Sequence, residues 1–411
     1  VIQMNIIHNK YIIQNETYLK GMILTNGIIF TQNALNVALI EKAKIQNQVY
    51  NMPINSEANR PQELIITNRK DNYSTVVSCV SPVDESKAVI IDADYSGELL
   101  AIVNKKILDD VVIHYVQEPT YYHKRITNGE LAKKYVSACG LDELDILPWK
   151  GCSISKLCRF CGVNNYIRRG DVTATAVASS ICFWNKRSYD YLRNLQEAIN
   201  IALKDACYKE HFHLILIAGN LANDKLDLEC RIFSEIAQFI MPLAGHKSRE
   251  GIVVVISPPN DINLLRLLKN SGVTNVVFNL EAVTEEGFKK YCPGKNDLGF
   301  NYFMDRLNAA VDIFGKGHVW SNLVLGLESV DLMLPECEAL AEQGVVMSAN
   351  VLHFDKGNTL DCGAPQLGDI VNFFFELEKI NSKHNFIPFY CAKALRTSLT
   401  NEAHEKRIVL K

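Results

Sequence analysis

The amino-acid sequence predicts an α/β protein, a partial TIM-type (β/α) barrel of six or more parallel strands preceded by an α+β accessory domain. From about residue 150 onward, apolar runs of four to seven residues alternate with helical stretches, which is the pattern of repeated βα units. Before about residue 140, short β-type runs are separated by polar turns. A chain of 411 residues is long enough for one barrel and an accessory domain.

The accessory domain is expected over residues 1–140. Its predicted strands are apolar runs bounded by turns that contain Asn, Pro, Asp and Gly. They are MILTNGIIF, QELIITN, STVVSCV, KAVIIDADY and DDVVIHYV. A connecting segment with a helix near residues 128–138 is expected to lead into the next domain.

The barrel is expected over residues 141–382, and residues 383–411 form a C-terminal segment that we place near the barrel mouth. The predicted strands are apolar and are each followed by a helical stretch, apart from the last. They are TATAVASSICFW (173–184), HLILIAGN (213–220), GIVVVISPP (251–259), VTNVVFNLE (273–281), HVWSNLVLGLES (318–329) and GVVMSANVLHFD (344–355), with KHNFIPFY (383–390) as a further candidate. In such barrels, functional residues lie at the C-terminal ends of the strands.

Composition limits the possible partners and the compartment. The chain has 48% hydrophobic and 22% charged residues and a formal charge of −3, which provides no basic surface for nucleic acid. No apolar run reaches the 18 residues of a spanning helix, and the first residues lack the apolar region of a signal peptide. Twelve cysteines without a regular framework indicate a reducing compartment. We therefore expect a cytoplasmic protein with no nucleic-acid and no membrane partner.

Three cysteines fall within ten residues, at Cys152, Cys158 and Cys161, in the spacing C-x5-C-x2-C. A [4Fe–4S] cluster takes one ligand per iron, so three thiolates leave one iron open to a small molecule. Two other readings stay open: a zinc site with a fourth ligand elsewhere in the chain, and structural cysteines that happen to cluster.

The motif resembles the signature of the radical S-adenosylmethionine (SAM) superfamily, which is usually C-x3-C-x2-C with an aromatic residue at the position of Phe160. The longer first gap is shared with a minority of the superfamily, including an enzyme that matures the iron-guanylylpyridinol cofactor. The resemblance implies a [4Fe–4S] cluster bound by the three cysteines, SAM as the second cofactor, and an electron donor such as flavodoxin or ferredoxin.

Later stretches resemble the biotin synthase-like subgroup and follow in the same order. Ala218-Gly219-Asn220 corresponds to the loop whose backbone receives the methionyl amine of SAM, although glycine at a strand end is often only a turn residue. Asn279 and Glu281 correspond to the pair that binds the ribose, and their i, i+2 spacing places both on one strand face. A loop-stabilising pair is the alternative.

Two more charged residues belong to the same resemblance. Arg306 matches the arginine that pairs with the SAM carboxylate, a role that suits a planar guanidinium; a solvated helix charge is the alternative. Glu328 ends the Gly-x-Glu stretch near which the backbone packs against adenine. VLHFDKGNTL resembles the segment at the sixth strand. The ligands of biotin synthase's second cluster are missing from VVVIS and SNLVLG, so a single cluster is expected.

The resemblance implies an enzyme that reductively cleaves SAM to a 5′-deoxyadenosyl radical and abstracts hydrogen from a small-molecule substrate, a natural product or a cofactor precursor. His353, Asp355, Arg396 and Ser398 are candidates to reach this substrate, with a structural role as the alternative for each. Two other functions stay open: a cofactor-maturation enzyme with the same cysteine spacing, and a zinc or iron–sulfur binding protein without turnover.

Overall fold

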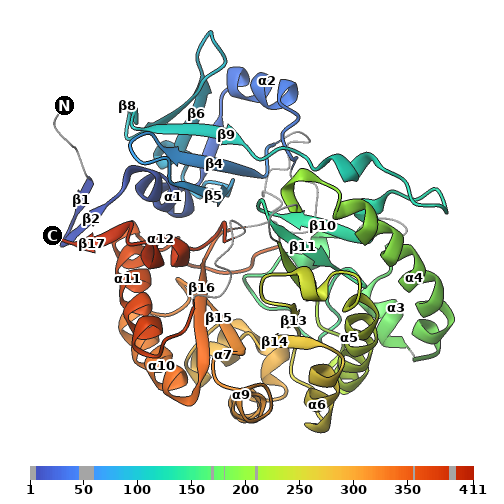
Figure 1. The fold of residues 1–411 in the computed structure, drawn as a ribbon. Helices are drawn as coiled ribbons and strands as arrows, with labels where there is room; N and C mark the ends of the chain where they lie inside the picture. The colour runs from blue at the N-terminus through green and yellow to red at the C-terminus, as the bar shows by residue number, and fades with distance from the viewer. Residues whose placement is uncertain are drawn as a thin grey trace.

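The computed structural model describes residues 6–45, 60–167, 171–179, 181–208, 212–354, 357–387 and 395–411. Its main feature is a curled seven-stranded sheet whose strands follow one another in sequence order (Figure 1). The strands are β10 (Val136–Cys139), β11 (Glu143–Ile146), β12 (His213–Ile217), β13 (Ile252–Val255), β14 (Val273–Val277), β15 (Val319–Leu325) and β16 (Val345–Val351). Only β10 is antiparallel to its neighbour, so six parallel strands form the partial barrel that the sequence predicts.

Both faces of this sheet are buried, which explains why its strands are nearly continuous runs of Val, Ile and Leu. On β12, Leu214 and Leu216 pack into the main core on the helix side. Ile215 points to the concave side, where it joins a separate apolar cluster with residues from four other strands. These residues are Val253, Val255, Val277, Trp320 and Val346. The cluster fills the inside of the half-barrel and leaves the strand ends for polar residues.

Helices cover the convex face of the sheet (Figure 1). They are α3 (Ala174–Ser179), α4 (Ile181–Ala202), α5 (Leu226–Ile240), α6 (Asn263–Asn270), α9 (Phe300–Phe314), α10 (Val330–Gln343) and α11 (Leu367–Lys383). Two shorter helices, α7 (Glu285–Tyr291) and α8 (Pro293–Asn296), lie beside the loop that follows β11. None of the helices among the described residues is long and apolar enough to cross a membrane.

The first barrel strand predicted at residues 173–184 is wrong, because residues 174–179 form α3 and residues 181–184 begin α4. Alanine-rich sequence favours a helix, and the buried positions Leu195, Ala198, Ile199 and Ala202 continue it with helical spacing. The first parallel strand is β11, which precedes the cysteines. The helix predicted near 128–138 is also wrong, since that segment contains one 3-10 turn at Ala132–Lys134 and then β10.

Within residues 6–45 and 60–135, the structure describes two smaller sheets and two α-helices, besides the short strands β1 and β2. One sheet consists of β3 (Ile28–Phe30), β6 (Val89–Ala93), β7 (Leu99–Val103) and β8 (Lys106–Ile107), and the other of β5 (Ser74–Ser78), β4 (Glu63–Asn68) and β9 (Val111–Tyr115). The helices are α1 (Asn15–Asn26) and α2 (Gln32–Ile40). Most of the predicted MILTNGIIF strand is therefore helix, and only its last residues form β3. The domain boundaries at residues 140 and 382 stay predictions.

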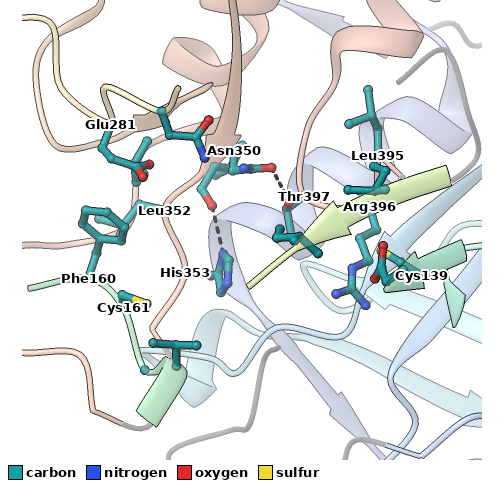
Figure 2. A pocket seen from close by; sticks show the side chains of 18 of the residues that line it. Cys139, Phe160, Cys161, Glu281, Asn350, Leu352, His353, Leu395, Arg396 and Thr397 are labelled. Atoms are coloured by element: carbon teal, nitrogen blue, oxygen red, sulfur yellow. Dashed lines mark hydrogen bonds between the residues drawn. The ribbon is translucent and has the colours of Figure 1, made fainter. Parts of the chain in front are cut away.

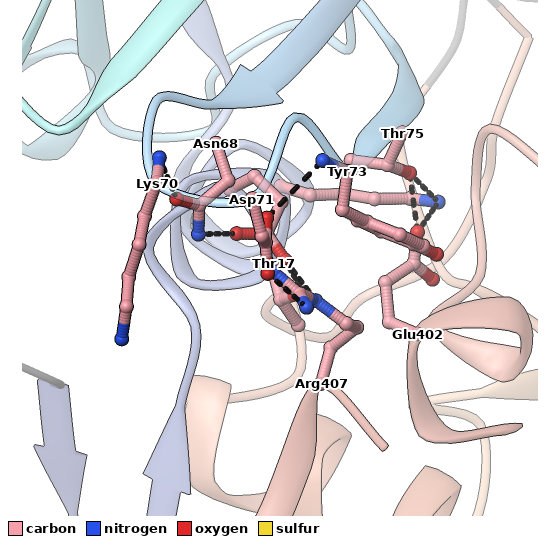
Figure 3. Close-up of polar contacts among 10 residues, drawn as sticks. Thr17, Asn68, Lys70, Asp71, Tyr73, Thr75, Glu402 and Arg407 are labelled. Atoms are coloured by element: carbon pink, nitrogen blue, oxygen red, sulfur yellow. Dashed lines mark hydrogen bonds and ion pairs between the residues drawn. The ribbon is translucent and has the colours of Figure 1, made fainter. Parts of the chain in front are cut away.

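The C-terminal segment returns to the N-terminal part. After α12 (Thr400–His404), strand β17 (Ile408–Leu410) pairs with β2 (Tyr11–Ile13), which pairs with β1 (Ile6–His8). Nearby, the buried ammonium of Lys20 lies 2.9 Å from the carboxylate of Glu402, and Arg407 binds Glu16 at 2.8 Å and Asp71 at 2.6 Å (Figure 3). These contacts anchor the segment that carries Arg396 beside the barrel. Residues 384–387 of the last predicted strand are not in a strand, and residues 388–390 lie outside the described residues.

Candidate functional site

The three cysteines of the C-x5-C-x2-C motif line one cavity of about 150 Å³. The loop that carries them begins after β11 and lies against the C-terminal ends of the next strands, so that Gly219, Asn220, Asn279 and Glu281 line the same cavity. Phe160 also lines it, as do apolar residues of β12 and β13. The structure therefore brings together eight predicted residues: Cys152, Cys158, Phe160, Cys161, Gly219, Asn220, Asn279 and Glu281.

The start of the cysteine loop is held by hydrogen bonds at both sides of Cys152. Its backbone N–H donates to the side-chain oxygen of Asn164 at 2.7 Å, and the Asn164 amide donates back to the Cys152 carbonyl at 3.0 Å. The N–H of Ser153 donates to the carbonyl of Asn220 at 2.9 Å, which joins the loop to the end of β12. These contacts hold the backbone of Cys152 beside the end of β12.

Gly219 permits the close approach of the two chains. A Cβ atom at this position would lie 2.1 Å from the carbonyl oxygen of Gly151 and 2.8 Å from the backbone nitrogen of Cys152. Its own carbonyl accepts a 2.6 Å hydrogen bond from the indole N–H of Trp149. Glycine is therefore required here by a backbone-to-backbone contact, in addition to any role toward a cofactor.

The five residues between Cys152 and Cys158 are supported by α7 and α8. A Cβ on Gly294 would lie 2.2 Å from the carbonyl oxygen of Lys156, and the Arg159 N–H donates to the carbonyl of Tyr291 at 2.9 Å. The Ser155 hydroxyl donates to the carboxylate of Asp297. The longer first gap of the motif thus has its own docking surface.

Asn279 and Glu281 are oriented by neighbouring strands. The side-chain oxygen of Asn279 accepts two 3.1 Å hydrogen bonds from Asn322, one from its backbone and one from its side chain. Glu281 has a left-handed backbone with φ 68°, unusual for a residue with a side chain. Its carboxylate lies 2.9 Å from the ammonium of Lys295, which also donates to the Asn279 carbonyl at 2.9 Å.

Lys295 places a buried positive charge beside the cysteines. Burial alone would lower the pKa of its ammonium, but the Glu281 carboxylate and the nearby Cys158 and Cys292 thiols raise that pKa overall. No sequence pattern pointed to this residue, apart from its position three residues after Cys292. A protonated lysine here would partly offset the negative charge of thiolates.

The donor set fits an iron–sulfur cluster. Burial raises the pKa of the Cys152 thiol to about 11 and that of Cys161 to about 12, while a hydrogen bond with Cys292 and then burial raise the pKa of Cys158. Thiolate is the ligand form, so binding of iron would release these protons. Three thiols and a cation in one cavity provide the chemistry that such a cluster needs.

Arg306 and Glu328 do not line the cavity. The Arg306 guanidinium donates to the carbonyls of Pro259 at 3.1 Å and Asn260 at 2.8 Å, which lie after β13. The Glu328 carboxylate accepts from the backbone N–H of Val283 at 2.6 Å, after β14. Both side chains hold loops at the C-terminal ends of strands, and their direct contacts with SAM stay predictions.

A second cavity of about 310 Å³ shares lining residues with the first, and Figure 2 shows this larger cavity. Phe160, Cys161, Asn279 and Glu281 line both cavities. The other lining residues come from the concave sheet face and the C-terminal segment: Cys139, Glu143, Asp145, Gly162, Val163, Ile215, Ile217, Val324, Asn350, Val351, Leu352, His353, Leu395, Arg396 and Thr397. A volume near 300 Å³ is at the lower end for small-molecule sites, which span roughly 300–1,000 Å³.

The structure separates the four substrate candidates. His353 and Arg396 line the larger cavity (Figure 2). Ser398 is fully buried and shares a 2.7 Å hydrogen bond with the Thr400 hydroxyl outside this lining, so its prediction as a substrate contact is wrong. Asp355 lies outside the described residues.

Sequence reasoning missed a polar group at the inner end of this cavity. Cys139 on β10 and Glu143 and Asp145 on β11 each present a sulfur or oxygen atom within 4.8 Å of the others. Burial and then the neighbouring Asp145 raise the pKa of Glu143 well above its usual range, and burial raises that of Asp145 to about 6. Alternation of acidic and apolar residues in ELDI was the available signal, because it places both carboxyl groups on one strand face.

Residues 146–336 match the family model for the radical SAM superfamily. This stretch is a radical SAM domain. Proteins of the superfamily use a [4Fe–4S] cluster and SAM, together with a small-molecule substrate and a reductant. The three cysteines lie within the matched residues. The matched model describes the whole superfamily, so the biotin synthase-like subgroup stays a prediction.

One curated relative is the bacteriochlorophyllide c C-7(1)-hydroxylase of Chlorobaculum limnaeum, 26% identical over 234 residues that cover 54% of this chain and 55% of the relative. The chain thus spans about half the length of this relative. Among solved structures, HydG of Carboxydothermus hydrogenoformans, an FeFe-hydrogenase maturase, is 15% identical with a TM-score of 0.39 over 57% of this chain and 49% of its own. HemN, the coproporphyrinogen III oxidase of Escherichia coli, is 13% identical with a TM-score of 0.38, and the match covers 65% of this chain and 58% of HemN. These two likenesses carry no information on function.

Proposed function

We propose that this protein is a radical SAM enzyme, and that it abstracts hydrogen from a small molecule bound in the 310 Å³ cavity. The observation that carries the proposal is the wall shared by the two cavities, since Phe160, Cys161, Asn279 and Glu281 line both. A radical made at the cysteine end would be separated from a bound substrate only by these residues. The relative that is named a hydroxylase supports chemistry on a small molecule.

The residues divide the task between them. Cys152, Cys158 and Cys161 would hold the cluster, which supplies the electron for reductive cleavage of bound SAM to methionine and a 5′-deoxyadenosyl radical. Asn279 and Glu281 would bind the ribose hydroxyls, because an oriented amide and carboxylate can accept hydrogen bonds from them. The electron would come from an external one-electron donor, a flavodoxin or a ferredoxin.

The backbone at the end of β12 has a second role beside the predicted one. The carbonyls of Gly219 and Asn220 each already accept one hydrogen bond from the cysteine loop, through Trp149 and Ser153. A carbonyl has two lone pairs, so each can accept one further bond from the methionyl amine of SAM. Gly219 and Asn220 would thus contact both the cysteine loop and SAM.

The inner surface of the cavity suits a partly apolar substrate. Ile215, Ile217, Val324 and Leu352 provide apolar walls, while Asn350 and Thr397 are already bonded to each other at 2.7 Å. Exclusion of water by such walls protects a reactive carbon radical from side reactions. Close contact between the reacting C–H and the radical carbon would then depend on the substrate filling the cavity.

The first test is cluster content. Anaerobically reconstituted protein should bind about four irons and four sulfides. The triple variant with Cys152, Cys158 and Cys161 changed to Ala should lose them, while Cys182→Ala, which removes an exposed cysteine on α4, should retain them. Full iron and sulfide content in the triple variant would refute the assignment, and one zinc without sulfide would favour a zinc site.

The second test is turnover. With dithionite and SAM, the reconstituted enzyme should release 5′-deoxyadenosine slowly, and faster when the substrate fills the cavity. Deuterium at the abstracted position should then appear in 5′-deoxyadenosine. An intact cluster and bound SAM without cleavage under any reducing condition would refute the proposed function, and a 3-amino-3-carboxypropyl product would refute the proposed radical.

A further inference from the structure

We propose that Cys139, Glu143 and Asp145 form a binding site for a divalent metal ion of the Zn²⁺ or Fe²⁺ type at the inner end of the 310 Å³ cavity. The thiol and the two carboxyl groups each have a potential ligand atom within 4.8 Å of the others. All three residues line the cavity, as does Cys161 of the cluster motif. The three ligands come from β10 and β11, which precede the cysteine loop in the chain, and none of them belongs to the C-x5-C-x2-C motif.

An unsatisfied oxygen points to a ligand at this site. Only 6% of the Asp145 surface is exposed, and its Oδ1 atom has no hydrogen-bond partner among the residues that the structure describes. Glu143 is only 9% exposed and lies two residues away on the same strand face. A buried carboxylate oxygen without a partner is costly in a folded protein. A metal ion would satisfy this oxygen directly.

The charge balance also favours a divalent cation. Behind the site, Glu63 binds the ammonium of Lys44 at 2.5 Å and the guanidinium of Arg396, and the Arg396 side chain lies beside Cys139 (Figure 2). Once metal binding has deprotonated Cys139, Glu143 and Asp145, these three residues and Glu63 are four anionic side chains beside the two cations Lys44 and Arg396. A divalent cation at the three ligands would make the buried group neutral. The cations behind the site would at the same time stabilise the thiolate that the metal requires.

The donor atoms limit the kind of metal. Carboxylates alone would suit Mg²⁺ or Ca²⁺, but a thiolate in the set favours Zn²⁺ or Fe²⁺. Three protein ligands leave a coordination position open, which is the arrangement of zinc sites that bind a further molecule. The lining places this open position toward the cavity. This step rests on the proposed function: the metal ion would bind an oxygen atom of the substrate at its open position and so orient the substrate relative to the three cysteines of the motif.

The test uses the full chain without its cluster ligands, so that metal binding is measured independently of SAM cleavage. In the variant with Cys152, Cys158 and Cys161 changed to Ala, we expect one equivalent of Zn²⁺ to remain bound after gel filtration. Titration with Co²⁺ should give the thiolate-to-cobalt charge-transfer absorption. Adding Cys139→Ser should abolish this absorption and weaken Zn²⁺ binding by at least about tenfold.

Glu143→Gln in the same background should weaken Zn²⁺ binding while keeping the cobalt–thiolate absorption, because the sulfur ligand is retained. Cys182→Ser, which removes an exposed cysteine far from the cavity in the sequence, is the matched control and should change neither. Circular dichroism checks that each variant is folded. The proposal is wrong if the cluster-free protein binds no Zn²⁺, or if Co²⁺ binds without thiolate absorption that depends on Cys139. A failure of SAM cleavage in the wild-type enzyme would refute the proposed function and leave this result unaffected.

Discussion

Gly219→Ala is the substitution whose effect the structure defines most directly. The new Cβ would lie 2.1 Å from the Gly151 oxygen, 2.5 Å from the Gly151 carbonyl carbon and 2.8 Å from the Cys152 nitrogen. All three atoms belong to the backbone, so no side chain can rotate away. The start of the cysteine loop must therefore move away from the end of β12.

The cost has two parts. Overpacking at a buried contact costs about 1–3 kcal/mol. The shift would also strain the hydrogen bonds from Trp149 to Gly219 and from Ser153 to Asn220, each worth about 0.5–1.5 kcal/mol. We therefore expect local destabilisation of roughly 2–4 kcal/mol, large enough to displace Cys152 from the position that a cluster needs.

Two measurements check this expectation. Iron and sulfide content after anaerobic reconstitution should fall markedly in Gly219→Ala, and thermal unfolding of the cluster-free protein should begin at a lower temperature. Gly363→Ala is the matched control, because a Cβ there meets no atom within 4 Å, and it should behave like the wild type. Wild-type cluster content and wild-type stability in Gly219→Ala would show that the loop does not contact β12 as described.

Three further substitutions test other parts of the structure. Glu281→Ala should weaken SAM binding by roughly ten- to a hundredfold, because a charge-assisted contact is lost, while the iron and sulfide content stays unchanged. If equilibrium dialysis gives the same SAM affinity as in the wild type, Glu281 does not contact SAM. Burial raises the pKa of Glu229 to about 8, so the native state keeps a proton that the unfolded chain loses near pH 4.5. The free energy of unfolding should therefore fall as the pH rises from about 4.5 to 8. Glu229→Gln should flatten this pH dependence in urea titrations, and an unchanged pH dependence would contradict the assignment. Glu63→Gln leaves the buried cations Lys44 and Arg396 without their anion and should destabilise the chain by about 3–5 kcal/mol, whereas a wild-type urea midpoint would show that the pairs contribute little.

Local sequence was sufficient for the cysteine motif and for most of the parallel strands. The runs that form β12 to β16 are apolar on both faces and are separated by helical stretches, so their order in the chain was also their order in the sheet. Gly219, Asn279 and Glu281 were predicted from the family resemblance, and the strand order explains why they meet, because the C-terminal ends of parallel strands lie at one edge of the sheet. The first strand could not be found in the same way. Its four residues, ELDI, carry two acidic side chains, and the alanine-rich segment after the cysteines looked more like a strand although it continues as a helix.

Only the tertiary structure decided which distant residues complete the site. Lys295 reaches Glu281 because α8 packs on the cysteine loop, and nothing in the local pattern around either residue indicates that ion pair. Arg396 reaches Cys139 because the C-terminal segment is anchored to the N-terminal part, across more than half the chain. The spacing of apolar residues in the sequence shows which face of a strand or helix is buried, because buried positions recur about every two residues in a strand and every three to four in a helix. Pairing of charges across the fold depends instead on how whole elements pack, and that information is spread over the entire sequence.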